Sequence, residues 1–230
     1  MSPTQGVIGE AWAMYKAHWQ HLLTISFVVY IAVALISVLL VAIMKDWVAG
    51  LLAAAVSLIA LFWVQGALVK AVEDVRDGRA DLSLGETFDR VRPQLSSIIV
   101  AGVLAGIAVF IGLLLLLVPG LVLMTLWVLI IPVIVLEQRS AGESFGRSRE
   151  LVRGYGWSVF GVIVLTILII IGFSIVLSIV LTPFDAWLES FLSNVISGTL
   201  TAPFIALTWT ILYYRLRGVK EPAEQPVAAP

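Results

Sequence analysis

Cysteine is missing from this chain of 230 residues, and charged residues are scarce. Without cysteine there is no disulfide, no thiolate metal ligand and no cysteine nucleophile. Only 13% of the residues are charged and 60% are hydrophobic, whereas an ordinary soluble domain is about 25% charged and about 45–50% apolar. Polar side chains are therefore too few to cover a surface that faces water, and most of the chain must face lipid or pack against itself.

The usual signatures of catalysis are missing as well. The two histidines, His18 and His21, are too few for a metal site, and no phosphate-binding loop, zinc-protease motif or serine nucleophile with a nearby histidine is found. The net charge of −1 gives no general attraction to nucleic acid. We therefore expect a protein that is not an enzyme, has no metal or cofactor, and does not bind nucleic acid.

What the sequence does contain is long apolar runs without internal charge. Six of them are long enough to cross a hydrocarbon core of about 30 Å as helices, and a chain in lipid must pair its backbone groups in this way. The runs are 22–44, 48–69, 95–117, 121–136, 157–181 and 191–214. Short turns at 45–46 and 118–120 join the first two pairs. The sequence predicts an all-α membrane protein with six transmembrane helices arranged as three helical hairpins.

A short motif of Gly, Glu, a small residue and an aromatic residue precedes each hairpin. The motif residues are Glu10 with Trp12, Glu86 with Phe88, and Glu143 with Phe145. Ser83 and Glu86 also match a capping box, which marks a helix start. We interpret the chain as one transmembrane domain, 1–217, built from three repeats at about 5–70, 82–137 and 140–214. Each repeat would open with an amphipathic helix in the cytoplasmic interface, and 218–230 would be a disordered tail.

The 14 Lys and Arg residues are divided unevenly between the two sides of this topology. Lys45 alone lies on one side, and the remaining 13 lie on the side of the three motifs and both termini. Cytoplasmic loops carry an excess of Lys and Arg. The sequence therefore predicts a multi-pass protein of the plasma membrane whose N-terminus and C-terminus are cytoplasmic.

The second half of the chain resembles a known family. The residues that carry the resemblance are Leu117-Val118-Pro119-Gly120, Trp127, 132–137 (PVIVLE), Arg147-Ser148, Leu151, Gly154, Trp157 and 212–217 (LYYRLR). They resemble the glycerophosphoryl diester phosphodiesterase membrane-domain family, whose domain precedes a soluble catalytic barrel in some bacterial proteins. This sequence contains only the membrane part, so phosphodiester hydrolysis does not follow. The resemblance implies a six-helix membrane protein without an established activity of its own.

Arginine residues cluster just before the fifth apolar run. Arginine at a cytoplasmic face can bind anionic lipid headgroups, because the guanidinium matches phosphate oxygens, although topology alone also places cations there. The candidate headgroup residues are Arg147, Arg149, Arg153, Trp157, Arg90 and Arg92. Part of this charge should be paired locally, from Glu143 to Arg147 and from Glu150 to Arg153.

Helix breakers suggest a cavity. Pro132 and Pro203 lie late in the second helix of their repeats and should kink or break it, as should Gly198, and Gln65 is a polar residue near the same level. Simple packing kinks are the alternative explanation. No Asp, Glu, Lys or Arg lies in the middle of a run, which disfavours ion transport but leaves a path for an amphiphile open.

Three functional hypotheses follow. The first is a non-enzymatic protein that interacts with membrane lipids, anionic ones in particular, or that binds a membrane-protein partner or a second copy of itself. The second is a transporter or flippase-like carrier of an amphiphilic substrate. The third, an interfacial enzyme, would require Glu10, Glu86 and Glu143 to meet at the cytoplasmic face.

Overall fold

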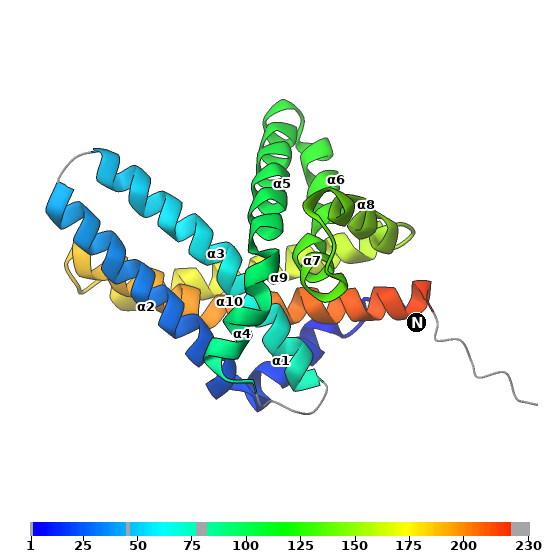
Figure 1. Ribbon diagram of the computed structural model, residues 1–230, viewed down its shortest axis with the longest axis horizontal. Coiled ribbons are helices and arrows are strands. Elements are labelled where there is room, and N and C mark those ends of the chain that lie inside the picture. Colours follow the sequence, from blue (N-terminus) through cyan, green and yellow to red (C-terminus); the bar gives the residue numbers. More distant parts are fainter. Residues whose placement is uncertain (1, 45–46, 77–81, 222–230) are drawn as a thin grey trace, which may run out of the picture.

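The computed structural model describes residues 2–44, 47–76 and 82–221, and these residues form helices without strands (Figure 1). The elements are α1 (Val7–Ala17), α2 (Trp19–Met44), α3 (Trp47–Arg76), α4 (Leu84–Val91), the 3₁₀ helix η1 (Arg92–Gln94), α5 (Leu95–Leu115), α6 (Leu117–Trp127), α7 (Ile130–Glu137), α8 (Ala141–Val152), α9 (Gly156–Leu181) and α10 (Ala186–Lys220).

Six stretches are long and apolar enough to span a membrane. They are Trp19–Met44, Trp47–Arg76, Leu84–Leu115, Leu117–Glu137, Gly156–Leu181 and Ala186–Lys220. The prediction of an all-helical, multi-pass membrane protein is confirmed at this level. The predicted turn at 45–46 and residues 222–230 of the predicted tail lie outside the described residues, whereas 218–220 of that tail are helical because α10 continues to Lys220.

The long helices lie in pairs that extend from a common base. α2 runs beside α3, α5 beside α6, and α9 beside α10, and the base is the region where α1, α4, α7 and α8 meet the adjoining helix ends (Figure 1). The main apolar core lies in the base, where Leu68, Leu151 and Tyr213 are fully buried. The far ends of the pairs instead expose large apolar side chains such as Leu39 and Leu115, which is the surface that lipid solvates.

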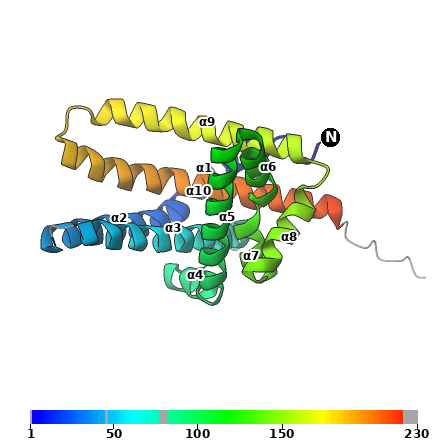
Figure 2. The same cartoon turned by 90° about the horizontal axis from the view of Figure 1, so that it is seen from above.

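The α5–α6 pair points in a different direction from the other two. It lies crosswise to α9 and α10 in both views (Figures 1 and 2), so the three pairs of long helices are not parallel to one another. The cause is a break between α6, which ends at Trp127, and α7, which begins at Ile130. Pro132 lacks an N–H group and its ring clashes with the carbonyl of Val128 four residues earlier. α7 stays in the base against α3 and α8, whereas α6 leaves with α5.

One serine of α8 pairs the backbone groups at this break. The Ser148 Oγ donates a hydrogen bond to the Leu126 carbonyl oxygen at 2.7 Å and accepts one from the Leu129 N–H at 3.3 Å. Ser148 and Leu129 are both fully buried. Because buried backbone groups without partners are costly, this side chain allows the chain to change direction inside the protein.

Two of the predicted interruptions are wrong. The chain turns between α5 and α6 at Leu116, and Pro119 and Gly120 lie in the first turn of α6, where backbone N–H groups have no partner within the helix. α10 is continuous through Gly198 and Pro203. Pro203 leaves the Thr199 carbonyl oxygen without its N–H partner in the helix; the Tyr15 hydroxyl donates to the next carbonyl oxygen, that of Leu200, at 3.1 Å.

A glycine lets α5 and α6 approach closely. A Cβ atom built on Gly120 would lie 2.5 Å from the backbone nitrogen of Leu113, a distance that real Cβ atoms do not show. Gly102 and Gly106, which lie four residues apart on α5, do not make such a close helix–helix contact. Gly102 makes room for the ring of Phe62, and Gly106 has no atom within 4 Å of its built Cβ.

The motif aromatic residues all make edge-to-face contacts with the base ends of long helices. Phe88 packs on Trp63 of α3 at 5.5 Å between ring centroids, and Phe145 packs on Trp127 of α6 at 4.9 Å. Trp12 packs on Phe204 of α10 at 6.4 Å. Both α4 and α8 begin with a capping box, Ser83 with Glu86 and Ser140 with Glu143. The first box was predicted, and the second has the same spacing.

Candidate functional site

Arg147 of α8 lies at the centre of a charged cluster in the base. Its side chain is only 7% exposed, and its guanidinium contacts three carboxylates. The Arg147 Nε lies 3.0 Å from the Glu137 carboxylate, its Nη1 lies 3.1 Å from Glu150, and its Nη2 donates to Glu221. The three partners belong to α7, to α8 itself and to the residue that follows α10, so one side chain joins the three elements.

Three further side chains complete this cluster. Arg139 donates to Glu137 at 2.7 Å, the Tyr213 hydroxyl donates to Glu137 at 3.0 Å, and Arg217 donates to Glu221 at 3.2 Å. The cluster therefore holds three carboxylates, those of Glu137, Glu150 and Glu221, and three guanidinium groups, those of Arg139, Arg147 and Arg217. These charges balance, so the cluster offers no excess positive charge to an anionic ligand.

The carboxylates change the protonation equilibria of the groups outside the spanning helices. Burial lowers the pKa of the Arg147 guanidinium, but its hydrogen bonds with Glu221, Glu137 and Glu150 raise that pKa more, so the group stays protonated. The hydrogen bonds from Arg147 and then Arg217 hold the pKa of the Glu221 carboxyl below its ordinary value. Both groups are therefore ionised at neutral pH.

The local ion pairs differ from those that we predicted. Glu143 is held by its capping box, where its carboxylate accepts hydrogen bonds from the Ser140 N–H at 3.0 Å and the Ser140 Oγ at 2.6 Å. These bonds lower the pKa of Glu143. Glu150 pairs with Arg147 instead of Arg153. The reason is that Arg147 lies on the inner face of α8, toward α7 and α10.

The candidate headgroup residues are thus divided by the fold. Arg147 is buried and its charge is compensated by three carboxylates, which argues against the headgroup role that we expected for it. Arg149 and Arg153 are exposed, as are Arg90 of α4 and Arg92 of η1. Trp157 is 88% exposed at the start of α9. α8 ends at Val152, and Gly154, with φ of +91°, turns the chain toward α9.

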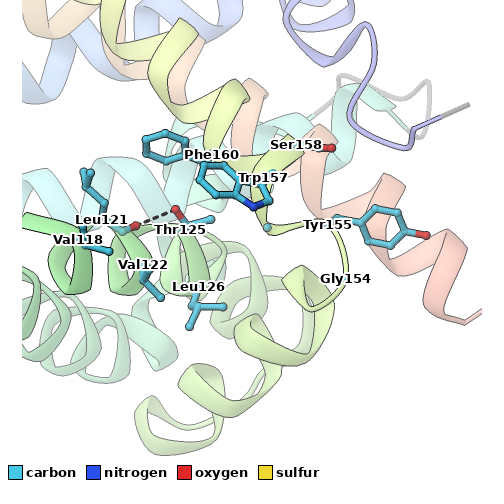
Figure 3. A pocket seen from close by; sticks show the side chains of 11 residues that line it. Val118, Leu121, Val122, Thr125, Leu126, Gly154, Tyr155, Trp157, Ser158 and Phe160 are labelled. Atoms are coloured by element: carbon cyan, nitrogen blue, oxygen red, sulfur yellow. Dashed lines mark hydrogen bonds between the residues drawn. The ribbon is translucent and has the colours of Figure 1, made fainter.

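An apolar groove of about 660 Å³ lies between α6 and the beginning of α9 (Figure 3). Leu121, Val122 and Thr125 of α6 form one wall, and Trp157 and Phe160 of α9 face them. The Thr125 hydroxyl is bonded to its own helix, to the Leu121 carbonyl oxygen at 2.8 Å. The groove is therefore lined with hydrocarbon, and it adjoins Gly154, the residue next to exposed Arg153.

A second groove, of about 420 Å³, lies among α3, α5, α7, α9 and α10. Gln65 and Pro132, two of the residues that we considered for a cavity between the repeats, are among its lining residues. Pro203 is buried but does not line this groove; Ala206 and Trp209 of α10 do. The break beside Pro132 leaves space next to the helix, whereas α10 remains straight enough to pack around Pro203.

The three motif carboxylates have separate partners. Glu86 and Glu143 are bound in their own capping boxes. Glu10 pairs with Arg215, whose guanidinium also donates to the carbonyl oxygens of Pro3 and Gln5. In the described part of the chain no group of three or more His, Asp or Glu side chains could hold a metal ion. The arrangement required by an interfacial enzyme is not present among these carboxylates.

Comparisons of the chain with protein-family models, with curated proteins and with solved structures give no match. The fold and the apolar surface define the class: a multi-pass, α-helical membrane protein.

Sequence reasoning missed the residues that hold the base together. Glu137 and Tyr213 lie near the ends of apolar runs, and Ser148 lies inside a polar helix. None of the three is therefore an unusual residue for its segment, and the sequence alone assigns none of them a role. One signal was present: Glu137 directly follows an apolar run, and a carboxylate at that place requires a cationic partner when it is buried.

Proposed function

We propose that this protein is a non-enzymatic membrane protein that binds an anionic amphiphile in the groove between α6 and α9. The groove of about 660 Å³ beside exposed cations carries the proposal. Its hydrocarbon walls suit an acyl chain, and Trp157 has the amphipathic ring that favours the headgroup region. Arg153, next to the groove, and Arg149, one helical turn earlier, would bind the phosphate.

Burial separates these two arginines from Arg147. A guanidinium that is 7% exposed and paired with three carboxylates has its charge compensated and presents little surface to a phosphate. Exposed Arg149 and Arg153 are not among the residues that form ion pairs in the described part of the chain. Each cation near an anionic surface contributes about 1 kcal/mol, so two contribute about 2 kcal/mol, or roughly thirtyfold in affinity.

The threefold repeat is part of this proposal. Phe88 of the second repeat packs on α3 of the first, Phe145 of the third packs on α6 of the second, and Trp12 of the first packs on α10 of the third. This cyclic order supports three duplicated hairpins with interfacial helices at their base. We propose that the base faces the cytoplasm, because the exposed cations lie there, and that the unit resembles the phosphodiesterase membrane-domain family.

The experiment compares two double variants of equal charge. Arg149→Gln with Arg153→Gln should weaken binding of dioleoylphosphatidylglycerol about tenfold or more, measured by native mass spectrometry of the purified chain. Arg90→Gln with Arg92→Gln removes the same charge from α4 and η1, which contribute no residue to the lining of this groove, and should leave binding nearly unchanged. Equal losses in both variants would reduce the effect to general surface charge and refute the site.

A carrier of amphiphiles is the second candidate, favoured by the groove among α3, α5, α7, α9 and α10 and by the break at Leu129. A crosswise hairpin connected through a break could change its direction relative to the other two. Since the chain has no cysteine, introduced pairs such as Val109→Cys with Ile167→Cys would be unique label sites. A single unchanging distance in lipid, together with no lipid scrambling in vesicles, would exclude this function.

A further inference from the structure

A third groove lies on the other side of the molecule, between α2, α3 and the first half of α10. Its volume is about 590 Å³, and Figure 2 shows α2 and α3 beside α10. Most of its wall is aliphatic, but five polar side chains from three helices line it: Tyr30, Ser37, Ser57, Ser190 and Asn194. No charged side chain of the described part of the chain is among its lining residues.

Two of these polar side chains donate hydrogen bonds to carbonyl oxygens of their own helices, and other donor and acceptor atoms in the groove have no partner among the described residues. The Ser57 Oγ donates to the Ala53 carbonyl oxygen at 2.7 Å, and the Asn194 Nδ2 donates to the Ser190 carbonyl oxygen at 2.8 Å. The Tyr30 hydroxyl, the Ser37 hydroxyl and the Asn194 amide oxygen form no hydrogen bond with any described residue. In a bilayer no bulk water replaces such a partner, so an occupant that donates and accepts hydrogen bonds is favoured.

Gly198 holds the key phenol in place. A Cβ atom at this position would lie 2.3 Å from a ring carbon of Tyr30. The ring therefore lies directly against the backbone of α10, and any larger residue at 198 would displace it. The glycine that looked like a helix breaker in the sequence instead fixes a hydrogen-bonding group in the wall of the groove, which is how a binding site is preorganised.

We infer that this groove binds an uncharged amphiphile whose head carries hydroxyl or ester groups, such as a diacylglycerol. The aliphatic wall contacts the acyl chains, while Tyr30, Ser37 and Asn194 exchange hydrogen bonds with the head. A phosphate is disfavoured here because no cation lines the groove to compensate for its lost hydration. This groove is separate from the one between α6 and α9 that we propose for an anionic amphiphile, since the two grooves share no lining residue.

The test offers the full-length chain three probes in turn: dioleoylglycerol, dioleoylphosphatidylglycerol and squalene, which has no polar group. Native mass spectrometry should show dioleoylglycerol retained more strongly than squalene. Tyr30→Phe combined with Asn194→Leu should weaken dioleoylglycerol about tenfold, or about 1.4 kcal/mol, and leave phosphatidylglycerol unchanged. Ser178→Leu, an exposed polar-to-apolar change on α9, is the matched control and should change neither.

A second variant fills the groove and serves as the test should Tyr30→Phe with Asn194→Leu not fold. Ala34→Trp places an indole in the groove and should abolish dioleoylglycerol binding while phosphatidylglycerol binding persists. Equal retention of squalene and dioleoylglycerol, or dioleoylglycerol binding that neither variant reduces, overturns the inference. The anionic site fails by a different result, which is phosphatidylglycerol binding that survives the loss of Arg149 and Arg153.

Discussion

Replacing Ser148 by Ala should destabilise the protein far more than loss of one small hydroxyl suggests. The Ser148 Oγ pairs two backbone groups at once, the Leu126 carbonyl and the Leu129 N–H. The site is fully buried at Ser148 and Leu129, so neither group gains water in compensation. An unsatisfied buried group costs about 1–3 kcal/mol, which gives about 2–6 kcal/mol for the pair.

The matched control lies one helical turn away. Ser144 is also fully buried on α8, but its hydroxyl donates only to Ala141 of its own helix, at 2.6 Å. Ser144→Ala should therefore cost about 1 kcal/mol. For a chain of this size 1 kcal/mol corresponds to roughly 2–4 °C. We expect Ser148→Ala to lower the Tm by roughly 4–24 °C, measured by thermal unfolding in detergent, and Ser148→Thr, which keeps a hydroxyl, to lower it less.

Equal, small changes of the Tm in Ser148→Ala and Ser144→Ala would refute this prediction. That result would mean that the backbone at the break finds other partners, and that Ser148 does not determine the direction of α6. A large effect at Ser148 alone supports the assignment of the break to the proline and its pairing to α8.

Two further predictions concern the helix contact and the charged cluster. Gly120→Ala should cost about 1–3 kcal/mol by overpacking against Leu113, whereas Gly106→Ala, with open space around it, should be neutral or stabilising; equal Tm values would contradict the close approach. Glu221→Gln should lower the Tm at neutral pH, because the folded state holds the pKa of Glu221 below its ordinary value. A lowered carboxyl pKa contributes stability above the unfolded value of about 4.3 that is lost as the pH falls through the folded value, so the difference from the wild-type chain should shrink between about pH 5 and pH 3. Asp89→Asn, which removes an exposed carboxylate that forms no ion pair with a described residue, is the control and should leave the Tm at neutral pH nearly unchanged.

The positions of most helices follow from the sequence because hydrophobicity acts locally. A run of about 20 apolar residues without charge has no stable state in water, and in lipid its backbone must be helical. The capping box at Ser83 follows equally, because it depends on residues within a few positions.

The tertiary structure decided the direction of the α5–α6 pair and the burial of Arg147 among carboxylates. Pro132 interrupts a helix and Pro203 does not, although the two look alike in sequence, because Ser148 pairs the backbone at the first while neighbours pack around the second. Arg147 and Arg149 are two residues apart, yet one is buried among carboxylates from 10 and 74 residues away and the other is exposed. Apolar patterning is local and can be read from a single chain segment; the partners of a buried polar group come from distant segments and exist only once the chain has folded.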